Sequence, residues 1–166
     1  MSISQSLLPE YDHEMASTRR ALERITPDKF GWTPHEKSMS LGRLASHLAE
    51  LPGWVKMTLT TDELDFGNGG YKPFIAETTE QLLELFDKNV AEGRAAIEAS
   101  SDEDFAKPWA LRNGDHVIFK MPRAGVLRGF TLSHVIHHRG QLTVYMRLTG
   151  IPVPSIYGPS ADEPNM

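Results

Sequence analysis

The 166-residue sequence contains no cysteine. A disulfide framework, a thiolate zinc site and a cysteine nucleophile are therefore excluded. Long apolar runs are missing as well, because no stretch approaches the roughly 18 apolar residues of a membrane-spanning helix. The first residues have neither the basic start nor the apolar core of a signal peptide. Together these absences predict a cytoplasmic protein with no membrane partner.

Positive charge is also scarce. Lysine and arginine number 17 against 22 acidic residues, which gives a net charge of -5. No basic run is longer than Arg19-Arg20, so the electrostatic footprint of a nucleic-acid-binding protein is missing. The remaining composition, 40% hydrophobic and 23% charged, is that of a globular protein, and the length suits one domain over residues 1–166.

Apolar residues at helical spacing predict four long helices. The first covers residues 4–25. The second covers 40–60, with Pro52 and Gly53 expected to kink or interrupt it. The third begins after a cap formed by Thr78 and Gln81 and continues to about residue 99. The fourth begins after Pro122 and ends at Gly150, in the position that glycine takes after a helix. A capping box from Thr33 to Glu36, with proline at the first helical position, predicts a short turn.

The connections carry turn signals. Residues 61–76, with Gly67, Gly69, Gly70 and Pro73, are predicted to form a loop. Residues 105–120 alternate around Asn113-Gly114 and predict a β-hairpin. Residues 151–166 hold four prolines and little periodicity, which predicts a C-terminal tail. The fold class is therefore all-α: a four-helix bundle with a small β-hairpin before the last helix.

Three of the seven histidines, His134, His137 and His138, cluster in the last predicted helix. At about 100° per residue, His134 and His138 lie one turn apart on an apolar face, and His137 lies off its centre. Two histidines four residues apart on one helix face can bind the same metal ion. The alternative is a pair of hydrogen-bonded or half-exposed histidines, and the spacing leaves both open. We interpret three other histidines, His13, His35 and His116, as structural or surface residues.

His47 strengthens the metal hypothesis. It borders the apolar stripe of the second predicted helix, and a bundle builds metal sites from inward side chains on facing helices. A site of His47, His134 and His138 would leave a coordination position open, which is typical of catalytic metals. Imidazole ligands suit zinc or nickel, and also iron or copper, so ligand type does not choose among them.

Two stretches resemble the conserved blocks of the DinB-like family, in the YfiT-like thiol S-transferase superfamily. The first is WTPHEKSMSLGRLASHLAE over residues 32–50, and the second is HVIHHRGQL over 134–142, with the pattern His-x-x-x-His-Arg-Gly-Gln. The resemblance implies an up-down-down-up four-helix bundle, a homodimer and a divalent metal bound by His47, His134 and His138. Characterised members include thiol-dependent S-transferases and a mycothiol-dependent isomerase, and some members are induced by DNA damage.

The resemblance implies a metal-dependent transferase that joins a low-molecular-weight thiol to a small electrophile. A metal lowers the pKa of a bound thiol or water and so makes a nucleophile near neutral pH. The absence of cysteine fits, because the thiol would come from the cosubstrate. Two alternatives stay open: a metal-dependent hydrolase, and a stress-related binding protein with a non-catalytic metal.

The remaining residues near the predicted site allow weaker inferences, and no catalytic residue is assigned. Gln141 is a candidate to orient a metal-bound water or a histidine, with a buried or interfacial amide as the alternative. We interpret Arg139 as an ion-pair or interface residue, Tyr145 as core, and Glu50 as solvated rather than hydrogen-bonded to an imidazole. A second apolar face of the last helix consists of Leu132, Val135, Ile136, Leu142 and Met146. This face predicts a twofold dimer.

Overall fold

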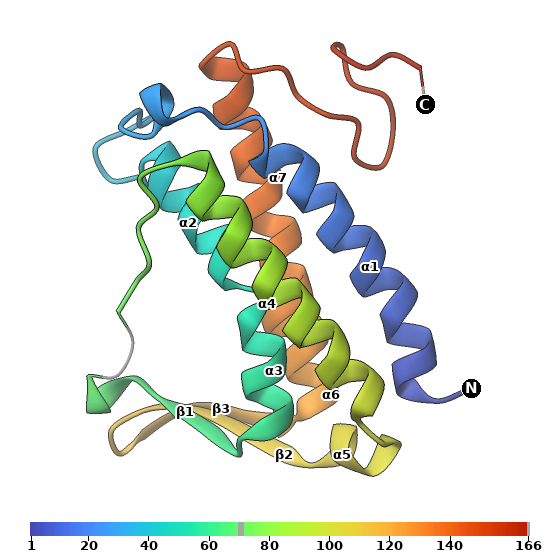
Figure 1. The fold of residues 1–166 in the computed structure, drawn as a ribbon. Helices are drawn as coiled ribbons and strands as arrows, with labels where there is room; N and C mark the ends of the chain where they lie inside the picture. Colours follow the sequence, from blue (N-terminus) through green and yellow to red (C-terminus); the bar gives the residue numbers. More distant parts are fainter. Residues whose placement is uncertain (70–71, 166) are drawn as a thin grey trace.

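Four helical columns run side by side, and a small sheet closes one end of them (Figure 1). This computed structural model describes residues 1–69 and 72–165. The first column runs up, the second and third run down and the last runs up, which confirms the predicted arrangement. The columns are α1 (Ile3–Leu22), α2 (Leu41–Glu50) continued by α3 (Gly53–Thr60), α4 (Thr79–Ala99) and α7 (Ser133–Leu148). Short elements join them: η1 (Pro27–Lys29), η2 (Phe66–Asn68), α5 (Asp102–Ala106), α6 (Arg123–Gly125) and η3 (Val126–Leu132).

Helix starts follow local capping chemistry. The Thr78 hydroxyl accepts a hydrogen bond from the Gln81 backbone N–H and caps α4, as predicted. Ser40 caps α2 in the same way. The capping box at Thr33 opens no helix, because the Thr33 hydroxyl donates to the carbonyl of His35 and closes a turn instead. The local signal therefore predicted the turn correctly.

Pro52 and Gly53 divide the second predicted helix into α2 and α3. Proline has no N–H to donate and its ring crowds the preceding turn, so the helix cannot pass through it unchanged. The break lies against α4, since a Cβ on Gly53 would come within 3.1 Å of the Asn89 side chain. The amide of Asn89 in turn donates to the carbonyl of Ala49. The interruption is thus built into the contact between two columns.

The sheet has three strands: β1 (Glu63–Asp65), β2 (Pro108–Asn113) and β3 (His116–Pro122). β2 and β3 form the predicted antiparallel hairpin, and Gly114 in its turn has a positive φ of 59°. β1 pairs in parallel with β2 and lies inside the segment predicted to be a loop. The Asp65 carboxylate fixes this junction by accepting from the backbone N–H groups of Gly67 and Gly114. Gly70 lies outside the described residues.

The last helical column begins at Arg123, as predicted, and contains a π-helical stretch, η3, before α7. It ends at Leu148 in a Schellman motif. The backbone N–H of Ile151 donates to Met146, that of Gly150 donates to Arg147, and Gly150 has a φ of 76°. Proline and glycine therefore bound this column where the sequence indicated.

The apolar face predicted to meet a second subunit is instead buried within this chain. Four of its five residues are buried: Leu132 is 2% exposed, and Val135, Leu142 and Met146 are 0% exposed. Ile136 is partly exposed. α7 lies between α1 and α2, so both of its apolar sides find cover in the same bundle. This face is therefore not available to a partner subunit. The homodimer stays a prediction, but this face no longer supports it. In the described ranges, no helix combines the length and apolar character that crossing a membrane requires.

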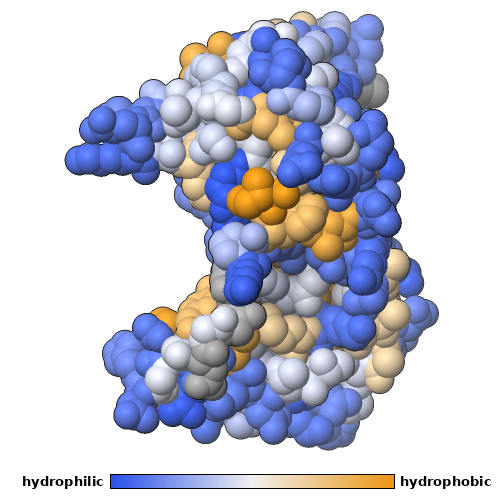
Figure 2. Space-filling view, turned by 60° about the vertical axis from the view of Figure 1, so that its left-hand side comes forward, coloured by the Kyte–Doolittle hydropathy of each residue, from blue (hydrophilic) through white to orange (hydrophobic). Residues whose placement is uncertain are grey.

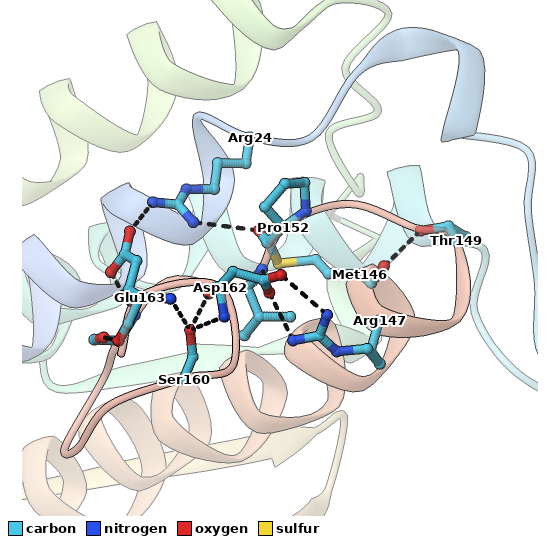
Figure 3. Close-up of polar contacts among 10 residues, drawn as sticks. Arg24, Met146, Arg147, Thr149, Pro152, Ser160, Asp162 and Glu163 are labelled. Atoms are coloured by element: carbon cyan, nitrogen blue, oxygen red, sulfur yellow. Dashed lines mark hydrogen bonds and ion pairs between the residues drawn. The ribbon is translucent and has the colours of Figure 1, made fainter. Parts of the chain in front are cut away.

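The C-terminal tail is irregular, as predicted, but it is bonded back onto the bundle (Figure 3). Asp162 pairs with Arg147 of α7 at 2.6 Å, and Glu163 pairs with Arg24 just beyond α1. The Ser160 hydroxyl accepts from the backbone N–H groups of both acidic residues. The tail therefore ties the end of α7 to the end of α1, and only Met166 lies outside the described residues.

Candidate metal centre

Three imidazoles meet where α2 crosses α7. The two helices run in opposite directions as neighbours (Figure 1). His47 faces the turn of α7 that carries His134 and His138. Nε2 of His134 lies 2.9 Å from Nε2 of His138 and 3.4 Å from Nε2 of His47. One ligand atom from each ring lies within 4.8 Å of the others, so the three could hold a metal ion. The structure thus brings together the three histidines proposed from sequence.

The hydrogen bond of His138 leaves a lone pair of its ring pointing at the neighbouring histidine. Nδ1 of His138 lies 2.7 Å from Oε1 of Gln141, an oxygen that can only accept, so Nδ1 carries the proton. Nε2 of His138 is then an acceptor, and it faces Nε2 of His134. A cation between the rings would bind this lone pair, and neutral imidazoles are good metal ligands, so the residues fit a bound metal.

The electrostatics favour neutral rings. Burial, followed by the neighbouring His138 and His47, lowers the pKa of His134 to about 4. Burial also lowers the pKa of His138, against the opposing effect of its hydrogen bond to Gln141. A metal ion competes with protons for imidazole nitrogens, so depressed pKa values leave the nitrogens available near neutral pH.

Glu50 stands behind His47 and was wrongly expected to be solvated. Its side chain is 11% exposed, and Oε2 lies 3.7 Å from Nδ1 of His47. Oε1 accepts from the backbone N–H of Phe74, which fixes the carboxylate. His47 Nδ1 is enclosed and has no hydrogen-bond partner, so a contraction of a few tenths of an ångström would complete a carboxylate–histidine pair.

Aromatic side chains flank the triad on the side of the sheet. The Trp54 ring lies 6.2 Å from the His134 ring and 4.9 Å from the Phe130 ring. Phe130 continues the row to Phe119 of β3 at 5.2 Å. Trp54, Phe119 and Phe130 are each partly exposed. The row gives the triad an apolar border that limits the access of water.

The comparisons with known proteins establish the family. A model of the DinB family matches residues 1–165. This chain belongs to the DinB family. It is 26% identical over 163 residues to the Bacillus subtilis protein YrdA, covering 94% of this chain and 89% of YrdA.

Solved structures of DinB-like proteins share the fold of this family member. A DinB-like protein from Bacillus cereus matches with a TM-score of 0.69 at 22% identity, over 94% of this chain and 98% of that one. A mycothiol-dependent maleylpyruvate isomerase matches with a TM-score of 0.61 at 14% identity, over 84% of this chain and 60% of that one. At these identities the likeness concerns the fold.

The other residues singled out from sequence take different places in the DinB-family chain. Gln141 holds the His138 ring, so its side chain orients a histidine, although the residue as a whole is exposed rather than buried. Tyr145 is partly buried and meets Trp32 edge to face. His137 is exposed and outside the triad, with its ring 4.9 Å from that of His138. The three remaining histidines are exposed, as expected: His13, His35 and His116.

Arg139 forms a buried ion pair, one of the two roles expected for it. Its side chain is 2% exposed, and Nη2 lies 2.6 Å from Oε2 of Glu14 on α1. Nη1 donates to the carbonyl of Glu14 and to the Thr18 hydroxyl. Tyr157 of the tail covers the pair, since its hydroxyl contacts both Arg139 and the Glu14 carboxylate. This pair lies behind the triad and fixes α7 against α1.

Two residues near these sites, Glu14 and Arg43, were not predicted from the sequence. Glu14 falls among Tyr11, Met15 and Thr18 at core spacing, so an acidic residue inside an apolar stripe was the available signal. Arg43 lies one turn before His47 on the same side of α2, and only the metal hypothesis makes that position notable.

The side of the molecule that Figure 2 brings forward is hollowed and shows apolar side chains. A separate groove lies along α4. It measures about 530 Å³ and is lined by Phe74, Ile75, Glu77, Gln81, Glu84, Leu85 and Lys88. None of the three histidines lines it. The volume of this groove alone therefore does not connect it to the chemistry of the triad.

Proposed function

We propose that this protein is a divalent-metal-dependent transferase that joins a low-molecular-weight thiol to a small electrophile. The observation that carries the proposal is the convergence of three imidazoles, from His47, His134 and His138. Three protein ligands leave a coordination position for a substrate, as in catalytic zinc sites. In the described ranges, no carboxylate or thiolate joins the three histidines as a further ligand.

The residues present favour a thiol over water as the nucleophile. A bound divalent ion would lower the pKa of a coordinated thiol, which begins near 8.5, far more easily than that of water. The chain supplies no cysteine, so the sulfur would belong to the cosubstrate. The fold likeness to a mycothiol-dependent isomerase supports the same choice.

The side chains around the triad have separate tasks in this proposal. Gln141 keeps the proton of His138 on Nδ1, so Nε2 of His138 stays free to bind metal. Trp54 and Phe130 shield the sulfur from water. In the transfer step, the S–H proton leaves to solvent and the sulfur forms a bond to the electrophilic carbon. The leaving group departs with the bonding electrons.

We also propose that the protein works in the cytoplasm as a homodimer. Low-molecular-weight thiols are kept reduced in that compartment. Val144 and Leu148 of α7 are 56% and 61% exposed, which leaves apolar side chains that a second subunit could cover.

The test begins with elemental analysis of untagged protein and of the variants His47→Ala and His137→Ala. We expect about one zinc or nickel ion, or an iron ion, per chain in the wild type and in His137→Ala, and its loss in His47→Ala. The loaded protein is then assayed with 2-mercaptoethanol and 1-chloro-2,4-dinitrobenzene. Metal-dependent formation of the thioether supports the transferase. Metal-dependent cleavage of 4-nitrophenyl acetate without thioether formation would favour a hydrolase, and no metal in the wild type would favour a binding protein.

A further inference from the structure

Arg43 differs from every other arginine in the described part of the chain. Each of the others donates at least one side-chain hydrogen bond: Arg19, Arg20, Arg24, Arg94, Arg112, Arg123, Arg128, Arg139 and Arg147. The Arg43 guanidinium donates none there, and its Nη1 is enclosed without a partner. Buried donors are rarely left unpaired, so this one requires an explanation.

The Arg43 guanidinium lies beside the triad. Arg43 is one turn before His47 on α2. Oε2 of Glu50 lies 3.5 Å from Nη1 of Arg43 and 3.7 Å from Nδ1 of His47, so the guanidinium and the imidazole face the same carboxylate. The side chain is 25% exposed, so part of its fork of donors reaches solvent.

Glu50 forms a long ion pair with Arg43 but accepts no hydrogen bond from it. Its Oε2 lies 3.5 Å from Nη1, beyond the 2.7–2.9 Å that is usual for a charged N–H···O bond. The same oxygen faces His47, and the other accepts from the backbone of Phe74. If the triad bound a divalent ion, the single negative charge of Glu50 would leave this region positive.

We propose that Arg43 is the anion-recognition residue of this site and binds a carboxylate of the small-molecule substrate. A planar guanidinium with free donors matches a carboxylate in two parallel hydrogen bonds. A single arginine suits one negative charge. The inference rests on the proposed thiol transfer for the place of the sulfur, and it adds the substrate class: a small acid.

The experiment compares two thiols of similar size on cobalt-loaded protein, 3-mercaptopropionate and 2-mercaptoethanol, by the thiolate-to-cobalt absorption band. We expect 3-mercaptopropionate to bind at least about tenfold more tightly to the wild type, as a charged hydrogen-bonded pair provides. Arg43→Gln should remove most of that preference and leave the affinity for 2-mercaptoethanol unchanged. Arg94→Gln removes an equal charge from an exposed pair and should change neither affinity. Metal titration of each variant reports separately on the triad.

A second arm decides which substrate carries the acid. Propionate is titrated by calorimetry into cobalt-loaded protein saturated with 2-mercaptoethanol. If propionate binds in an Arg43-dependent way while 3-mercaptopropionate shows no preference, the carboxylate belongs to the electrophile. If 3-mercaptopropionate shows the preference, one molecule reaches both the metal and Arg43. Either result supports the anion site.

Two results distinguish a failure of the Arg43 anion site from a failure of the proposed thiol transfer. If neither thiol produces the absorption band, the thiol chemistry fails, and propionate titration of cobalt-loaded protein without thiol then judges Arg43 by itself. Binding that Arg43→Gln weakens about tenfold supports the anion site in that case too. Equal affinities in Arg43→Gln and the wild type, or no binding of any carboxylate, would overturn the inference.

Discussion

The buried pair of Arg139 and Glu14 makes the stability of the bundle depend on one guanidinium. Replacing Arg139 with methionine keeps most of the side-chain volume and removes the charge and its three donated hydrogen bonds, to the carbonyl of Glu14, the Thr18 hydroxyl and the Tyr157 hydroxyl. The Glu14 carboxylate, 7% exposed, would stay buried with only the Tyr157 hydroxyl as a side-chain donor among the described residues.

Breaking a buried pair by removing one partner costs about 3–5 kcal/mol. For a chain of this size, 1 kcal/mol corresponds to roughly 2–4 °C in Tm, so we expect Arg139→Met to lower Tm by roughly 6–20 °C. Urea unfolding followed by circular dichroism at 222 nm measures the free energy directly. Arg94→Met is the matched control, because its pair with Asp12 is exposed and should contribute less than about 1 kcal/mol.

The double variant Arg139→Met with Glu14→Leu tests the cause. If the loss comes from an unpaired charge, removing the second charge should restore most of the stability, because an apolar replacement of a whole buried pair is often neutral. An Arg139→Met variant within about 1 kcal/mol of the wild type, or a double variant that shows the full sum of both losses, would refute the reasoning.

Four further predictions concern single features. His138→Ala should lose the metal and His137→Ala should keep it, as elemental analysis would show; the reverse result would contradict the assigned face of α7. Gly150→Ala should lower the unfolding free energy by about 1 kcal/mol, because its φ of 76° is unfavourable for residues with a Cβ, and an unchanged urea midpoint would contradict this. Asp104 has a pKa lowered to about 2, first by its bond to Lys107, so its stabilising effect should be present above pH 4 and vanish as the pH falls towards 2; the difference between wild type and Asp104→Asn in urea should close over that window. Light scattering at micromolar concentration should give the mass of a dimer, and a monodisperse monomer would contradict the homodimer.

The helices and their limits could be predicted because their signals are local. Thr78 caps its own helix three residues away, and Gly150 with Pro152 ends another. The positions of His134 and His138 follow from the helix period alone. The prediction that His47 lies beside them needed one further assumption, that the second and last helices are neighbours.

The missed features depend on residues far apart in the sequence. β1 has three residues and exists because β2, more than 40 residues later, pairs with it. The dimer face was misassigned because periodicity shows that a helix is apolar on two sides but not which neighbour covers each side. The ion pair of Glu14 and Arg139 becomes evident only when α1 and α7 are packed side by side. Neither residue indicates the pair by itself.

The bonds between the tail and α1 have a consequence for biosynthesis. Arg20 and Arg24 leave the ribosome before their acceptors at Pro152, Ser155 and Glu163, which are made 128 to 139 residues later. Closing loops of that length costs entropy that only an otherwise assembled bundle can offset. We therefore expect the first helix to remain incompletely anchored on the nascent chain until residues 152–163 have been made.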